Sequence, residues 1–168
     1  IALSVGRLLG CAMPDEIHVM RKTVIDGSNT GGFQRTAVVG LDGKIKVDGE
    51  KIVIEQIALE EESARIESKS EHETVYRLSG LGIPLVEITT GTVDSAEKLQ
   101  KLAEHIGLLL RSFRVQRGIG SIRQDVNVSI ARGARVEIKG FQELEKMTQL
   151  VKNEEKRQQD LLNVMDKL

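Results

Sequence analysis

The stretch IPLVEITT at residues 83–90 is an apolar segment with a single carboxylate, Glu87, in its middle. Side chains alternate between the two faces of a β-strand, so Leu85, Glu87 and Thr89 point to one face. Burying an ionised carboxylate among apolar residues is costly unless a cation or hydrogen-bond donors meet it. Glu87 therefore either points into solvent from an exposed face or belongs to a site that holds a cation, and the stretch alone leaves both possibilities open.

Upstream of this stretch, the chain has the patterns of further strands. Apolar and β-branched residues bounded by turn residues predict strands at 16–25, 51–59, 64–68 and 74–78. Asp42-Gly43 predicts the turn of a hairpin between residues 35–39 and 44–47. A short amphipathic helix is expected before them at residues 1–9. The first 90 residues are therefore predicted to be mostly antiparallel sheet.

Downstream of residue 92, the apolar residues recur at helical spacing and predict a helix near 95–112. Alternation returns at residues 121–130 and 136–139, which predicts a second hairpin. A C-terminal helix is expected from about 143, and its polar stretch at 153–160 is either solvated or covered by something outside the sequence. These elements predict an α+β fold with residues 1–168 as a single domain.

Composition narrows the class of protein. The 168 residues carry 24 Lys and Arg against 25 Asp and Glu, a formal net charge of −1, so any polyanionic partner must be met by a local patch. The single cysteine, Cys11, excludes an intrachain disulfide and a multi-cysteine metal site, as is typical of a reducing compartment. No apolar run is long enough to span a membrane. A cytoplasmic protein without a membrane partner is expected.

Several polar residues are candidates for chemistry. Glu61 ends an apolar strand, and Glu61 and Glu87 are two carboxylates on what is predicted to be one sheet. Two carboxylates brought together repel each other unless a cation lies between them. The pair therefore suggests Mg²⁺ and a nucleotide. Asp125 could extend that site, and Arg123 and Lys139 could contact phosphate oxygens. The alternative is that both groups of residues are simply solvated.

The glycine-rich loop at residues 27–32 offers backbone N–H groups of the kind that bind anions, and it includes Ser28 and Asn29. Its neighbours Arg21, Lys22 and Arg35 favour a phosphate ligand. The loop has neither the Walker spacing nor a dinucleotide-binding fingerprint, and it could equally be a wide hairpin turn.

Five motifs in order resemble the B/E subunit family of tRNA-dependent amidotransferases (GatB/GatE), in its archaeal E type. They are HVMRK at 18–22 through GFQRT at 32–36, LEEESAR at 59–65, LGIPLVEI at 81–88, GSIRQDVNVS at 120–129 and VEIKG at 136–140. The resemblance covers nearly the whole chain. It implies that the chain is a fragment of the cradle-shaped catalytic domain of a longer polypeptide.

The resemblance also implies a reaction. Members of the family use Mg²⁺ and ATP to phosphorylate the side-chain carboxylate of glutamate on misacylated Glu-tRNA(Gln), and ammonia from a separate asparaginase-like D subunit then displaces the phosphate. By the same resemblance, Glu61 and Glu87 are expected metal ligands, Asp125 and Lys139 are catalytic candidates, and a Glu and a His upstream of this sequence complete the metal site.

The resemblance also implies residues that bind the nucleotide or tRNA, and an oligomeric state. Five residues are candidates, with Arg123, for binding the nucleotide or the acceptor end of tRNA: Arg21, Lys22, Ser28, Asn29 and Arg35. A homodimer in the full complex is expected, and the isolated fragment is expected to be inactive. The alternatives are a non-catalytic RNA-binding or scaffolding module of the same fold, and an ATP-dependent carboxylate-activating enzyme of another family.

Overall fold

The computed structural model describes residues 1–118 and 120–168. The chain divides into two compact units. The first comprises Ile1–Lys46 and Glu50–Thr92, and the second comprises Val47–Gly49 and Val93–Leu168. Each is described by itself.

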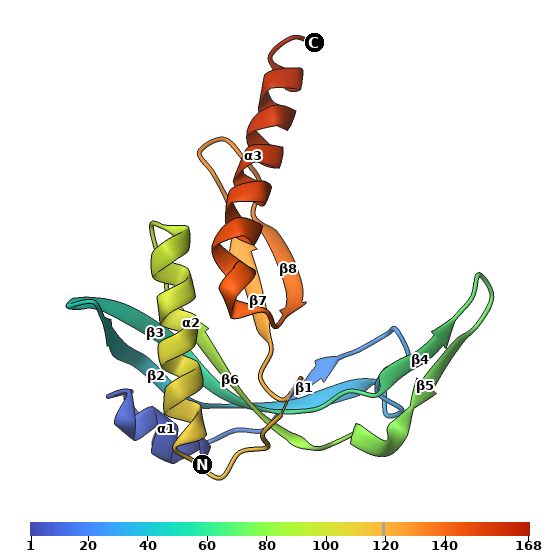
Figure 1. Cartoon of the computed structure of the whole chain (residues 1–168). Coiled ribbons are helices and arrows are strands. Elements are labelled where there is room, and N and C mark those ends of the chain that lie inside the picture. The colour runs from blue at the N-terminus through green and yellow to red at the C-terminus, as the bar shows by residue number, and fades with distance from the viewer. Residues whose placement is uncertain (119) are drawn as a thin grey trace. The chain divides into compact units, whose positions relative to one another are not determined.

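The first unit is built on a four-stranded sheet with the order β1-β2-β3-β6 (Figure 1). Its strands are β1 (Met20–Thr23), β2 (Phe33–Val47), β3 (Glu50–Glu61) and β6 (Pro84–Thr90). The β1·β2 and β3·β6 pairs are antiparallel. The IPLVEITT stretch is thus a strand, as the alternation predicts, and it pairs with the strand that ends in Glu61.

The turn between β2 and β3 is Asp48-Gly49, and the predicted hairpin at Asp42-Gly43 is wrong. Asp48 and Gly49 have φ values of 48° and 88°, as a two-residue hairpin turn requires, whereas β2 continues through Asp42 and Gly43. Gly43 serves close packing instead, because a Cβ there would clash with the Cys11 sulfur and lie 3.0 Å from the Leu9 carbonyl oxygen. The Asp-Gly pair at 42–43 therefore marks a tight contact and not a turn.

Smaller elements complete the first unit. Helix α1 (Ala2–Leu8) precedes the sheet, and its Val5 is fully buried. Strands β4 (Arg65–Lys69) and β5 (Thr74–Arg77) form an exposed two-stranded ribbon, followed by the 3-10 turn η1 (Leu78–Gly80). Buried β3 residues such as Ile54 and Ile57 supply the apolar core of this unit.

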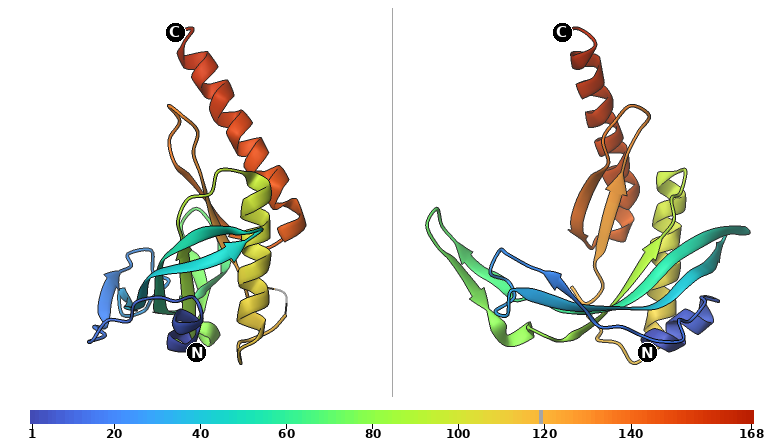
Figure 2. Two further views of the ribbon diagram at one scale, coloured as in Figure 1. Left: turned by 90° about the vertical axis from the view of Figure 1, so that its left-hand side faces the viewer. Right: turned by 180° about the vertical axis from the view of Figure 1, so that it is seen from behind.

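The second unit packs two helices with a hairpin (Figure 2). It contains α2 (Ala96–Arg111), β7 (Gln124–Val128), β8 (Val136–Phe141), the 3-10 turn η2 (Leu144–Lys146) and α3 (Met147–Met165). The Ser95 side chain caps α2 by accepting from the Lys98 N–H at 3.2 Å. A core of five buried residues joins the elements: Ala96, Val126, Val128, Met147 and Val151. The predicted helices and the second hairpin are confirmed.

The polar stretch at 153–160 is partly buried within the unit itself. Gln158 is 4% exposed; its Nε2 donates to the Val128 carbonyl at 3.2 Å, and its Oε1 accepts from the Ile130 N–H at 3.3 Å. Glu154 is 8% exposed and receives two hydrogen bonds from the Arg157 guanidinium. Gln158 thus satisfies backbone groups of the hairpin, while the partners of Glu154 lie on its own helix, so helical position alone does not separate solvated from buried polar residues.

The α+β class, with its antiparallel sheets and C-terminal helix, is confirmed. None of the helices in the described residues combines the length and the apolar character needed to cross a lipid bilayer.

Candidate functional site

Glu61 is held by Arg35 at the end of β3. Its Oε2 accepts from the Arg35 backbone N–H at 3.0 Å, and its Oε1 accepts from Arg35 Nη1 at 2.8 Å. The backbone N–H and then the guanidinium of Arg35 lower the pKa of the Glu61 carboxyl below its ordinary value. Glu61 is therefore an ionised carboxylate in a fixed position, with 24% of its side chain exposed.

Glu87 lies on the neighbouring strand. The ladder pairs Glu87 with Ala58 and Glu61 with Pro84, so the two glutamates are three positions apart along the ladder. Directly opposed residues of a regular sheet share a face, which assigns Glu87 and Glu61 to opposite faces. A backbone N–H lies in the plane of its sheet, however, so the Glu61 carboxylate that accepts from Arg35 lies near that plane rather than far out on either face.

The same register brings Glu60 to the face of Glu87, because Glu60 opposes Leu85. The Glu60 side chain is 13% exposed; its Oε1 lies 3.8 Å from Lys22 Nζ and 3.4 Å from the Thr36 hydroxyl. A third carboxylate, which the sequence patterns did not single out, thus lies beside the two that they did.

Arg21 and Arg35 oppose each other in the β1·β2 ladder and share a face. The guanidinium carbon of each lies 5.4 Å from the centre of the Phe33 ring. This distance is within the range of cation–π contacts. The structure therefore brings two of the predicted phosphate-binding arginines together around an aromatic side chain.

The loop at 27–32 is held by its own contacts. The Asp26 carboxylate accepts from the backbone N–H and the hydroxyl of Ser28, at 2.9 and 2.6 Å. Asn29 is 5% exposed, and its Oδ1 accepts from the Ser63 hydroxyl at 2.8 Å. The Tyr76 hydroxyl donates to the Asp26 carbonyl. These bonds account for Ser28 and Asn29 as residues that shape the loop, and their predicted role in ligand binding stays a prediction.

In the second unit, Asp125 and Lys139 are brought together across the β7–β8 hairpin. Asp125 Oδ2 accepts from Lys139 Nζ at 3.0 Å and Oδ1 from the Gly140 N–H at 2.8 Å, while Lys139 also pairs with Glu137 at 3.0 Å. Burial raises the pKa of Asp125, but the Gly140 N–H and the Lys139 ammonium outweigh it, so the pKa lies below its ordinary value. Arg123 contributes to this lowering.

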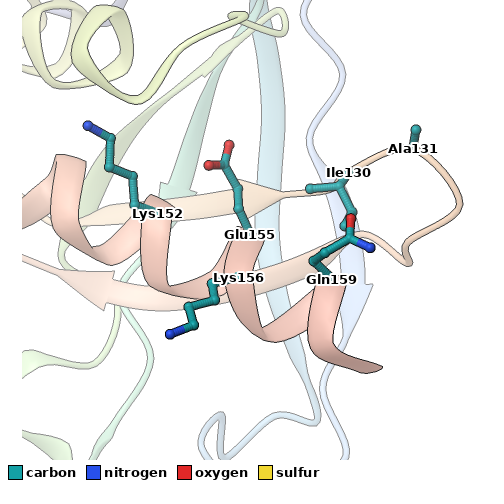
Figure 3. Close-up of a pocket in the computed structure, with 6 residues that line it drawn as sticks. All are labelled: Ile130, Ala131, Lys152, Glu155, Lys156 and Gln159. Carbon is teal, nitrogen blue, oxygen red and sulfur yellow. The ribbon is translucent and has the colours of Figure 1, made fainter. Parts of the chain in front are cut away.

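An open groove of about 550 Å³ lies elsewhere in the second unit, between the β7–β8 loop and α3 (Figure 3). Its lining residues are Ile130, Ala131, Lys152, Glu155, Lys156 and Gln159. Lys152 Nζ pairs with Glu97 at 2.5 Å. None of the predicted site residues lines this groove, and a shallow surface of mixed charge has little of the enclosure of a small-molecule site.

The carboxylate oxygens of Glu61 and Glu87 are the type of ligand atom that magnesium prefers. Glu61 and Glu87 offer hard oxygen ligands on adjacent strands, and Mg²⁺ takes one or two carboxylates together with waters and substrate phosphates. Among residues 1–118 and 120–168, no three His, Cys, Asp or Glu side chains gather at one point. The described residues therefore form no closed metal cage, and the role of Glu61 and Glu87 as metal ligands stays a prediction.

Comparison with known proteins first defines the class. A profile described as the GatB/GatE catalytic domain matches residues 1–167, so the chain belongs to this family. Among curated proteins, it is 51% identical over 170 residues to the E subunit of glutamyl-tRNA(Gln) amidotransferase from Sulfolobus acidocaldarius, covering 100% of this chain and 27% of that protein. Its counterpart in Archaeoglobus fulgidus is 51% identical over 170 residues, covering 100% of the chain and 28% of that protein. The chain spans about a quarter of the length of these relatives.

Phe33 and Glu60 were missed by reasoning from the sequence, although signals for both were present. Phe33 is two residues from Arg35 on one strand, so the two share a face. Glu60 alternates with Glu61, and only the register against β6 decides which of them faces Glu87. Strand spacing could have identified the first residue, whereas the second needed the paired sheet.

Proposed function

We propose that the chain is part of a tRNA-dependent amidotransferase that converts misacylated Glu-tRNA(Gln) into Gln-tRNA(Gln). The whole-length similarity to E subunits of glutamyl-tRNA(Gln) amidotransferases carries this proposal. The two carboxylates on adjacent strands, and Arg35 beside one of them, support it. The ammonia would come from an asparaginase-like D subunit, and the tRNA would be the second macromolecular partner.

The proposed reaction has two balanced steps. A side-chain carboxylate oxygen of the tRNA-bound glutamate attacks the γ-phosphorus of ATP, and ADP leaves. Ammonia then attacks the activated carbonyl carbon, phosphate leaves, and a proton is released as the amide forms. Phosphoryl transfer asks a protein mainly for positioning and charge stabilisation, so no protein nucleophile is required.

The roles of the residues follow from their contacts. Glu61 and Glu87 would hold Mg²⁺, which, when bound, would neutralise charge on the phosphate oxygens. Arg35 keeps Glu61 ionised and fixes its position. Arg123, Lys139 and Lys22 are the remaining cations proposed to meet phosphate. Asp125 orients Lys139 through their ion pair, so its contribution is proposed to be positional.

A transamidation assay tests the proposal. The full-length subunit, its amidohydrolase partner, Mg²⁺-ATP and Glu-tRNA(Gln) should give Gln-tRNA(Gln), and Glu87→Gln should abolish the product while leaving tRNA binding intact. Glu71→Gln, at the exposed turn between β4 and β5, is the matched control and should retain activity. Full activity of the Glu87 variant would overturn the assignment of this residue.

Two further results would revise the proposal. A comparison of Glu60→Gln with Glu61→Gln identifies which glutamate of β3 acts with Glu87, since the register favours the first and the family resemblance the second. A wild-type protein that binds tRNA but forms no Mg²⁺-ATP-dependent product would instead support a non-catalytic RNA-binding module.

A further inference from the structure

Gln34 is a buried polar side chain that precedes Arg35 on β2. Only 8% of Gln34 is exposed, and it lies on the opposite face of the strand from Arg35, because successive side chains alternate. Its Nε2 donates to the backbone carbonyl of Glu61, the last residue of β3. A buried amide is costly unless it is hydrogen-bonded, so this contact accounts for a polar residue at position 34.

Two consecutive residues of β2 therefore hold Glu61 at three atoms. Gln34 binds the backbone carbonyl oxygen, while the N–H and the guanidinium of Arg35 bind the two carboxylate oxygens at 3.0 and 2.8 Å. The first contact fixes the main chain of Glu61, and the other two fix its side chain. The carboxylate meets both donors of Arg35 only while the end of β3 stays beside β2.

The contact lies where the pairing of β2 with β3 comes to an end. These strands are neighbours in the sheet; β2 begins at Phe33 and β3 ends at Glu61. The next residue, Glu62, bonds toward β6, since its N–H donates to the Ile83 carbonyl at 2.7 Å. Backbone groups of successive strand residues point to alternate sides, so the Glu61 carbonyl points toward β2, and the Gln34 side chain supplies a donor there.

We infer that Gln34 is a positioning residue, whose amide keeps the Glu61 carboxylate at the place that Arg35 defines. This inference rests on the proposed function, in which Glu61 is a ligand of the metal ion. Groups that orient metal ligands typically contribute 10- to 100-fold to metal affinity or activity. Gln34 acts through the backbone of the ligand rather than on its carboxylate, so an effect of about 10-fold, the lower end of that range, is expected.

The test replaces Gln34 by methionine in the full-length subunit. Methionine is unbranched and close to glutamine in length, so Gln34→Met removes the N–H donor with little change of shape. Binding of Mn²⁺ in the presence of ATP, followed by electron paramagnetic resonance, should weaken about 10-fold. In transamidation with the amidohydrolase partner, the KM for Mg²⁺ should rise by a similar factor, while kcat at saturating Mg²⁺ should be largely retained.

A second readout needs no metal ion. The Arg35 N–H donates to the Glu61 carboxylate, so its hydrogen exchange reports whether the carboxylate stays in place. Exchange of this amide should be about 5- to 10-fold faster in Gln34→Met, as expected for one weakened hydrogen bond. An unchanged exchange rate would show that Gln34 does not hold Glu61.

Gln158→Met is the matched control. Gln158 is also buried, and its Nε2 also donates to a backbone carbonyl, that of Val128, but it lies in the second unit. This variant should lose stability while its Mn²⁺ affinity and the exchange of the Arg35 amide stay as in the wild type. A general loss of stability lowers the folded fraction, and with it kcat, but leaves the KM for Mg²⁺ unchanged. Equal weakening of Mn²⁺ binding in the two variants would overturn the inference.

Gln34→Asn covers the case in which the methionine variant does not fold. It keeps a polar amide at position 34 but is one methylene shorter, so its donor falls short of the Glu61 carbonyl. Its Mn²⁺ binding should therefore be weakened as in Gln34→Met. Wild-type affinity in the asparagine variant would show that the reach of the glutamine side chain is unimportant.

The outcomes also separate this inference from the proposed function. If Glu61→Gln weakens Mn²⁺ binding while Gln34→Met changes neither readout, the role of Glu61 stands and the inference is wrong. If Glu61→Gln leaves Mn²⁺ affinity unchanged while Gln34→Met still speeds exchange of the Arg35 amide, the metal role of Glu61 fails and its positioning by Gln34 stands.

Discussion

Gln158→Ala is expected to loosen the β7–β8 hairpin from α3. The buried side chain donates to the Val128 carbonyl and to Glu154 Oε1, and it accepts from the Ile130 N–H. A neutral hydrogen bond contributes about 1 kcal/mol and one to a charged acceptor about 2 kcal/mol, so losing all three should lower the free energy of unfolding of this unit by about 3 to 4 kcal/mol.

Gln159→Ala is the matched control. Gln159 is exposed at the next position of α3 and donates to Asn163 at 3.2 Å. Gln159→Ala therefore changes the helix propensity by the same amount as Gln158→Ala but removes no buried hydrogen bond. Its free energy of unfolding should change by about 0.5 kcal/mol or less.

Two measurements check this prediction. Urea unfolding is followed by far-UV circular dichroism, because the chain has no Trp and only one Tyr for fluorescence. Hydrogen exchange of the Ile130 amide gives a local value, and its protection should fall by about two to three orders of magnitude in Gln158→Ala, at tenfold per 1.4 kcal/mol. Equal stability of the two variants, with the Ile130 amide still protected, would refute the reasoning.

Three further predictions concern protonation and backbone strain. The pKa of Glu154 is lowered from 4.5 to about 2, first by its arginine partner. The stability that the ionised Glu154 contributes is therefore complete above pH 4.5 and is lost as the pH falls from there toward 2. In a plot of urea unfolding midpoints against pH, Glu154→Gln should flatten this acid side of the curve. Arg35→Gln should raise the pKa of Glu61 only part of the way to its ordinary value in an NMR titration, because the backbone N–H remains as the larger cause. Gly27→Ala should lower the unfolding midpoint more than Gly82→Ala: both have positive φ, but only at position 27 would the added Cβ meet a tyrosine ring, at 3.3 Å.

Each of these has a clear contrary result. An acid limb that keeps its slope in Glu154→Gln would show that this carboxylate does not carry the loss of stability. A Glu61 pKa at its ordinary value after Arg35→Gln would mean that the backbone contact is unimportant. Equal unfolding midpoints for the two glycine variants would show that backbone strain accounts for the whole loss of stability and that the contact of the added Cβ with the tyrosine ring contributes nothing.

Local patterns were sufficient for most of the elements. The alternation around Glu87 predicts β6, and the helical spacing after residue 92 predicts α2, because both periods follow from the geometry of one segment. The Asp42-Gly43 prediction failed because an Asp-Gly pair can serve either a turn or a close contact. Only the packing of Cys11 against β2 distinguishes the two uses.

The candidate site divides in the same way. The sequence by itself determined which residues carry charge, that Glu87 lies on a strand, and, through its motifs, the family. Only the tertiary structure decided that Arg35 holds Glu61, that Glu60 shares the face of Glu87, and that Phe33 lies beside two arginines. The physical reason is register: alternation fixes which residues of one strand share a face, but the pairing of separate strands decides which of those faces coincide.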